Sequence, residues 1–306
     1  MKWDFKPYYS LDYFLKEKFG GKIAKISVDA GFTCPNRDGT LSFAGCSFCS
    51  GRGSGDFAFF KGESVISQLE KGRDAIKKWK PAGYIAYFQA YTNTYAPVDV
   101  LRKKYFQALE LEGLKGIAIA TRPDCIDGDV LALLKELSEK TYVWVELGFQ
   151  TSNEKTAEKI NRGYKNEVFA DAVQRLCKNG IDVVAHVIFG LPGETDEDMM
   201  KTIDFLNKTH IKGIKIQSLH VLKDTPLGRE FEENPFKTLE KDEYIRLVCK
   251  ALEKLSPEIV IHRLTGDGKK SNVIAPKWAF DKKSVLNRVY KTLTAKNSWQ
   301  GRDFVL

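Results

Sequence analysis

The chain has 306 residues, of which 43% are hydrophobic and 29% are charged. This composition is typical of a globular protein that is long enough for a full α/β barrel core or for two small domains. No apolar run is long enough to span a membrane, and residues 1–20 lack the apolar core of a signal peptide. We therefore expect a cytoplasmic protein without a membrane partner.

The net charge of +8 is concentrated at one end of the chain. Residues 269–306 contain nine Lys or Arg and two Asp, a local balance of +7. Aromatic residues are interleaved with these cations, at Trp278, Phe280, Tyr290, Trp299 and Phe304. This pattern is typical of a surface that follows phosphates and stacks bases, which indicates an anionic partner such as RNA. The alternative is a helix whose cations only face solvent and whose apolar face packs on the protein, through Val285, Leu286, Val289 and Leu293.

Apolar periodicity predicts strands that alternate with helices along most of the chain. The expected strands are 23–29, 84–88, 116–121, 142–149, 181–189 and 214–222. The expected helices are 63–80, 98–112, 127–139, two pieces over 153–179, and 196–208. Six βα repeats with short connections require a parallel sheet. We therefore predict an α/β fold, a partial (β/α)6 TIM-like barrel.

The domain prediction divides the chain at residue 225. Residues 1–225 contain the barrel and an aromatic-rich N-terminal lead-in, and 226–306 form a basic C-terminal α/β extension packed on the core. In the extension we expect a helix over 240–255, a strand-like run over 258–264, a Gly-rich turn over 265–272 and a helix near 282–295.

Three cysteines lie in a Gly/Asn/Asp-rich loop directly after the first predicted strand. Eleven residues separate Cys34 from Cys46, and two separate Cys46 from Cys49. Three thiolates are one too few for a closed tetrahedral zinc site, but they suit a four-iron cluster with one open iron, since such clusters normally take four Cys. A zinc site completed by a His, or three unrelated thiols, are the alternatives.

This loop resembles the cluster loop of radical S-adenosylmethionine (SAM) enzymes, with the aromatic Phe48 just before the last Cys. The usual loop of that superfamily has three residues between the first two Cys, so the gap here is a departure. It is similar to the longer loops of the Elongator catalytic subunit and of YhcC/YtqA-like radical SAM proteins, and the latter match nearly the whole chain. The resemblance implies a 4Fe-4S cluster on Cys34, Cys46 and Cys49, SAM on the open iron, and reductive cleavage of SAM with electrons from a donor such as flavodoxin or ferredoxin.

Side-chain parity separates the two faces of the fourth predicted strand. Glu146, Gly148 and Gln150 point into the barrel near the C-terminal end of the strand, where the active sites of such folds lie. The resemblance implies that Glu146 contacts the ribose of SAM, with Gln150 beside it. The alternative is a buried carboxylate that pairs with Lys25, Lys215 or Arg162.

The resemblance assigns further positions to SAM. Ile188 and Gly190 would lie against the adenine. The methionyl amino group would be held after the second strand, with Gln89, Tyr91, Thr92 and Asn93 as candidates. Arg162 would neutralise the methionyl carboxylate, unless it is a solvated arginine at a helix end. A core histidine is the expected role of His186, and Cys125 follows a strand end near the expected active site.

Three functions are compatible with the sequence. The first is a radical SAM enzyme that modifies RNA, with tRNA favoured by the similarity to the Elongator subunit. The second is a radical SAM enzyme that acts on a small molecule or a protein side chain. The third is a non-catalytic, zinc-stabilised RNA-binding protein.

Overall fold

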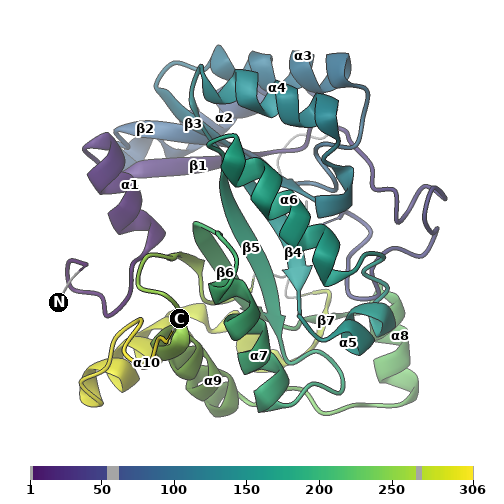
Figure 1. Ribbon diagram of the computed structural model, residues 1–306, viewed down its shortest axis with the longest axis vertical. Coiled ribbons are helices and arrows are strands. Elements are labelled where there is room, and N and C mark those ends of the chain that lie inside the picture. The colour runs from purple at the N-terminus through teal and green to yellow at the C-terminus, as the bar shows by residue number, and fades with distance from the viewer. Residues whose placement is uncertain (1–2, 54–61, 267–270, 306) are drawn as a thin grey trace.

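A computed structural model describes residues 3–53, 62–266 and 271–305 (Figure 1). Seven parallel strands form one curved sheet in the order β1-β2-β3-β4-β5-β6-β8. The strands are β1 Ile23–Val28, β2 Gly83–Phe88, β3 Leu114–Thr121, β4 Tyr142–Gln150, β5 Asp182–Phe189, β6 Gly213–Ser218 and β8 Val260–Arg263. The predicted α/β class and partial barrel are confirmed, and the strand-like run of the extension joins the same sheet beside β6.

The described residues form ten α-helices, most of which cover the convex face of the sheet (Figure 1). Their bounds are α1 Leu11–Phe19, α2 Val65–Ile76, α3 Val98–Leu109, α4 Gly128–Ser138, α5 Glu154–Lys159, α6 Asn166–Lys178, α7 Asp196–Asn207, α8 Pro226–Glu233, α9 Lys241–Lys254 and α10 Lys282–Ala295. All the helices predicted between the strands are present, and the helix predicted near 282–295 is α10. In the described residues no helix combines the length and the apolar character that a membrane span requires.

The sixth predicted strand is interrupted. β6 ends at Ser218, which pairs with Phe189, the last residue of β5. Because β5 offers no partner beyond that point, the chain leaves the sheet, and the short β7 Val221–Leu222 pairs antiparallel with β9 Val273–Ala275 instead. The sequence analysis predicted neither β9 nor α8. Residues 267–270 of the predicted Gly-rich turn lie outside the described residues.

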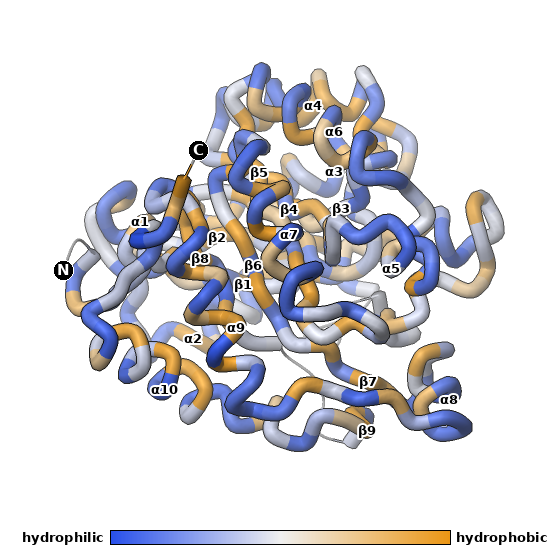
Figure 2. The backbone as a smooth tube through the Cα atoms, turned by 60° about the horizontal axis from the view of Figure 1, so that its bottom comes forward, coloured by the Kyte–Doolittle hydropathy of each residue, from blue (hydrophilic) through white to orange (hydrophobic). Residues whose placement is uncertain are grey.

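The main core lies between the outer face of the sheet and the helices, and the apolar residues of Figure 2 follow the strands through the interior. The outward-facing residues of β4 belong to this core, as parity predicts: Val143, Val145, Leu147 and Phe149. α10 packs on α9 through Val285, Val289 and Leu293. Leu286, which was expected on the same face, is 38% exposed, so the buried face is narrower than predicted.

Candidate active site

A cavity of about 240 Å³ opens at the C-terminal ends of the parallel strands. The segments that line it include the residues that end β3, β4 and β6 and the loops that follow β1 and β2. Small residues on the inner face, Ala120 of β3 and Gly148 of β4, leave room there. Most of the predicted site residues line the cavity: Cys34, Cys46, Phe48, Cys49, Gln89, Tyr91, Thr92, Glu146, Gln150 and Ile188.

The cysteine loop is held by two side chains that the sequence analysis did not identify. Asn36 is 1% exposed, and its amide donates to the backbone oxygen of Asn161 (2.7 Å) and to Cys46 Sγ (3.6 Å). Arg37 lines the cavity and donates from Nη2 to the backbone oxygens of Cys49 and Ser50, at 2.7 Å each. These contacts orient the loop from within and tie it to the segment that follows α5.

The three thiols face the same cavity, and a thiolate donor set of this kind fits an iron–sulfur cluster. Burial raises the pKa of the Cys46 thiol to about 12, while the Arg122 charge and the Asn36 amide act in the opposite direction. Within the described residues, no three His, Cys, Asp or Glu side chains are arranged to hold a metal ion as they stand. A ready-made site for a single ion is therefore not found in that part of the chain.

Two of the described non-glycine residues of the cavity wall have positive φ, which is uncommon outside glycine. Tyr91 has φ 62°, and its hydroxyl donates to the Gly51 backbone oxygen (2.7 Å). Gln150 has φ 63° and follows a bulge, since Gly148 pairs with His186 while Gln150 pairs with Val187. Its amide lies over Gly148, where a Cβ would be only 2.8 Å from Gln150 Nε2. The buried Oε1 of Gln150 has no hydrogen-bond partner, which leaves an acceptor at the cavity.

Glu146 lies at the base of the cavity and accepts hydrogen bonds from several directions. Tyr87 Oη donates to Oε2 at 2.7 Å, and Trp144 Nε1 donates to Oε1 at 3.0 Å. His186 Nε2 lies 2.8 Å from Oε2, and Lys215 Nζ forms an ion pair with the same oxygen. Lys25 Nζ is 4.0 Å from Oε1. Of the three pairings proposed as the alternative for Glu146, those with Lys25 and Lys215 are present.

These neighbours determine the protonation states of Glu146 and His186. Burial opposes the charge of Glu146, but the Lys215 and Lys25 charges and the His186 hydrogen bond hold its pKa well below the ordinary value. Burial, followed by the Lys215 charge, lowers the pKa of His186 to about 4, so this ring is neutral at neutral pH. As expected, His186 is hydrogen-bonded inside the barrel, yet it lines the cavity and its side chain is 24% exposed.

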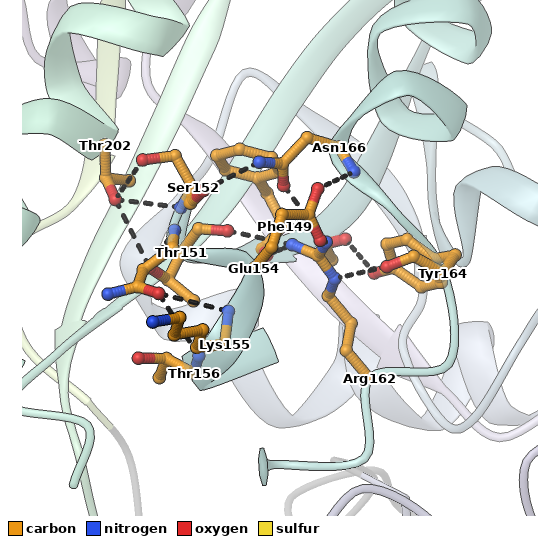
Figure 3. Close-up of polar contacts among 12 residues, drawn as sticks. Phe149, Thr151, Ser152, Glu154, Lys155, Thr156, Arg162, Tyr164, Asn166 and Thr202 are labelled. Atoms are coloured by element: carbon orange, nitrogen blue, oxygen red, sulfur yellow. Dashed lines mark hydrogen bonds and ion pairs between the residues drawn. The ribbon is translucent and has the colours of Figure 1, made fainter. Parts of the chain in front are cut away.

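Arg162 is not among the residues that line the cavity. It is 1% exposed, and its donors are used within the protein (Figure 3). Nε donates to the Tyr164 backbone oxygen, Nη1 to those of Phe149 and Thr151, and Nη2 to Glu154 and Asn166. A guanidinium has five N–H donors, and these contacts use all of them. The burial and internal contacts of Arg162 match neither the predicted contact with the methionyl carboxylate nor a solvated arginine at a helix end. They favour a structural role.

Arg122, directly after β3, lines the cavity together with Arg37 and Arg263. Asp124 binds it in a bidentate pair, at 2.9 and 2.7 Å, and Nη1 donates to the Arg162 backbone oxygen. The neighbouring Cys125 is partly exposed and does not line the cavity. Gly190, predicted at the adenine, has φ 86° and lies against Leu239 outside the cavity lining, so its conformation serves the turn after β5.

Comparison with known protein families identifies the class of this site. Residues 33–206 match the radical SAM superfamily, and residues 211–295 match the Radical_SAM C-terminal domain. The chain belongs to the radical SAM superfamily. Its members use a 4Fe-4S cluster and SAM, so the chain is a radical SAM enzyme and these are its cofactors.

Relatives cover almost the whole chain. The protein YtqA of Bacillus subtilis is 46% identical over 98% of this chain and 93% of its own length, and the protein YhcC of Escherichia coli is 35% identical over 86% and 85%. A tRNA-2-methylthio-N(6)-dimethylallyladenosine synthase of Lachnoclostridium phytofermentans is 32% identical over only 32% of the chain and 22% of that protein. These matches confirm the predicted YhcC/YtqA-like family.

The fold is similar to that of Elp3 from the archaeon Methanocaldococcus infernus. The TM-score is 0.69 at 16% identity, over 91% of this chain and 64% of that one. At this level of identity the match concerns the fold alone.

Proposed function

We propose that this radical SAM enzyme modifies RNA, with tRNA as its substrate. The observation that carries the proposal is the position of the basic C-terminal segment. Its β9 pairs with β7, whose Leu222 lines the cavity. Burial and then the charge of Arg263, another cavity residue, lower the pKa of Lys282, so α10 begins within electrostatic range of the cavity. The segment that the sequence indicates for RNA therefore runs beside the cavity mouth.

The rest of α10 gives weaker support to RNA binding. Arg288 forms an ion pair with Asp242, and Lys241 forms one with Asp281. These contacts fit the alternative in which the cations of this helix form an ordinary solvated face. The partly matching tRNA synthase favours tRNA over other RNA, because its name places its activity on a tRNA base.

Within this proposal Cys34, Cys46 and Cys49 hold the cluster. Phe48, Gln89, Tyr91, Thr92, Gln150 and Ile188 line the space for SAM. Together the cluster and SAM supply radical chemistry when bound, and the side chains position SAM and exclude water. Glu146 reaches the SAM ribose only if one of its present donors moves away. His186 is the least costly donor to displace, because it is neutral and the most exposed of those in direct contact. Flavodoxin or ferredoxin is the proposed electron donor.

The substrate class is tested by measuring whether tRNA stimulates the cleavage of SAM. Anaerobic, reduced enzyme is incubated with SAM, with and without bulk tRNA, and release of deoxyadenosine is followed. We expect tRNA to raise the release several-fold above background. The paired substitutions Lys277→Gln and Lys282→Gln should weaken tRNA binding and flatten its salt dependence, whereas Lys291→Gln with Lys296→Gln, farther along the same segment, should change it less. Release that tRNA leaves at background would contradict the RNA proposal and favour a small molecule or a protein side chain.

The cluster ligands are tested by Cys46→Ala. We expect this variant to lose most of its iron and acid-labile sulfide while it keeps the far-UV spectrum of the wild type, because the loop lies outside the main core. Cys177→Ala is the matched control and should retain full iron, since that thiol lies on α6 and donates to the His210 backbone oxygen. Full iron in Cys46→Ala would show that other side chains hold the cluster. Zinc without iron in the wild type would favour the zinc-stabilised alternative.

A further inference from the structure

Two lysines share one carboxylate on the inner face of the barrel. Lys215 of β6 pairs with Glu146 and donates to Tyr87 Oη at 3.1 Å. Lys25 of β1 lies 4.0 Å from the other oxygen of Glu146. Both ammonium groups are 4.6 Å from the centre of the Tyr87 ring. The side chains of Lys215 and Glu146 are 4% and 0% exposed, so this pair lies almost entirely away from solvent, whereas the side chain of Lys25 is 24% exposed.

The arrangement has more cations than anions. Two lysines face a single carboxylate, and the other titratable groups bonded to Glu146 are neutral at neutral pH, since the pKa of His186 is about 4 and burial raises the pKa of Tyr87. Burial of a charge without a partner is costly. The excess of positive charge also affects Lys215. Burial, and then the charge of Lys25, lower the pKa of Lys215, although the charge of Glu146 raises it. An anion that entered here would relieve both the desolvation and the repulsion.

The group of side chains around Glu146 is open to an anionic ligand on the side that faces the cavity. Lys215, Tyr87 and His186 line the cavity, as do Gln217 of β6 and Arg263 of β8. None of these residues is among the predicted SAM contacts. Lys215, Gln217 and Arg263 present ammonium, amide and guanidinium groups to the cavity, while the single donors of Tyr87 and His186 serve the carboxylate of Glu146. A wall that is rich in donors and holds excess positive charge suits an anionic group.

The geometry points to an anion subsite for the substrate in this part of the cavity, in which Lys215, with Lys25 behind it, binds a carboxylate or a phosphate of the substrate. This inference rests on the proposed function, because it assigns a binding site to an anionic group of the RNA substrate. The chemistry is shared by a carboxylate on a modified base and a phosphate of the nucleotide, and separate probes distinguish these two sources.

The test uses the full chain with its cluster, prepared anaerobically and saturated with SAM. Thermal unfolding is measured in acetate or inorganic phosphate, with chloride at equal ionic strength as the reference. Lys25→Met leaves Lys215 and Glu146 as a neutral pair, and Lys291→Met on the exposed side of α10 is the matched control. We expect acetate or phosphate to raise the unfolding midpoint of the wild type and of Lys291→Met by about 3 °C at ten times the dissociation constant. Lys25→Met should lose that rise and unfold at a higher temperature than the wild type in chloride.

The more effective probe identifies the anion, carboxylate or phosphate. Because excluded anions stabilise all proteins, only the difference between the variants is interpreted. Equal shifts in the wild type and Lys25→Met, or no shift in either, would overturn the subsite, and so would a shift that appears only without SAM, since the anion site would then belong to the cofactor.

Should Lys25→Met not fold, Gln217→Leu keeps both lysines, removes one donor and must reduce the shift. Anion binding without tRNA stimulation would leave the subsite standing and contradict only the RNA proposal, and the reverse result would contradict only the subsite.

Discussion

Single polar side chains on the inner face of the sheet govern what the cavity can bind. Parity along β4 places Glu146 inward from sequence alone, and the structure agrees. Apart from Trp144, the partners of that carboxylate come from β1, β2, β5 and β6, far away in the chain. Arg162 shows the opposite case. Its place in the sequence suggested a ligand contact, but its donors hold the backbone after β4 together.

Glu194, at the turn after β5, gives a prediction at the residue scale. Burial raises the pKa of this carboxyl to about 7 from an ordinary value of 4.5, and Thr151 donates a hydrogen bond to it. Between those pH values the folded protein keeps a proton that the unfolded chain releases, so stability falls as pH rises. Glu194→Gln should remove about 2 kcal/mol of the loss between pH 5 and 7.5, measured by urea unfolding. Parallel pH profiles of variant and wild type would show that this carboxyl titrates normally.

Individual elements meet at contacts that a periodic pattern does not reveal. α8 begins where Thr225 Oγ1 accepts from the Gly228 backbone N–H (3.0 Å), and the Leu227 N–H donates to the Ser47 backbone oxygen (2.9 Å). This helix is therefore hydrogen-bonded to the cysteine loop at Ser47. It was missed because it has only eight residues and begins at Pro226, shortly after the run that was predicted as the sixth strand.

Two glycines test this packing at the element scale. A Cβ on Gly228 would lie 1.9 Å from the Leu222 backbone oxygen, whereas one on Gly128, at the start of α4, would meet nothing within 4 Å. Gly228→Ala should destabilise the protein by about 2–3 kcal/mol, because backbone must move. Gly128→Ala should leave stability unchanged or raise it by up to about 1 kcal/mol. Urea unfolding of both variants decides, and similar stabilities would contradict the close approach of α8 and β7.

At the scale of the whole molecule, the lead-in is hydrogen-bonded to the last part of the chain. Gln300 is fully buried and accepts from the Tyr9 backbone N–H (2.9 Å), while its amide donates to the backbone oxygens of Ser256 and Ile259, at 2.7 Å each. The Ile261 N–H in turn donates to the Tyr9 backbone oxygen. The lead-in, β8 and the last residues are therefore held as one unit on the edge of the barrel.

This junction predicts cooperative behaviour of the whole chain. Gln300→Ala removes three buried hydrogen bonds to the backbone and should cost about 2–4 kcal/mol. Lys291→Ala, on the exposed side of α10, should change stability by less than about 0.5 kcal/mol. Chemical unfolding followed by tryptophan fluorescence and by circular dichroism should give coincident transitions for both variants. A separate early transition in Gln300→Ala would mean that the C-terminal extension unfolds independently of the barrel.

The sequence by itself determined the order of strands and helices, the inward and outward faces of β4, and the place of Cys34, Cys46 and Cys49 after the first strand. These features follow from local periodicity and from the short connections that parallel strands require. Only the tertiary structure decided the partners of Glu146, the internal role of Arg162, the place of Arg122 in the cavity and the break between β6 and β7. The reason is physical: each depends on the register and approach of segments distant in the chain, where burial and hydrogen bonding are settled by packing and not by local pattern.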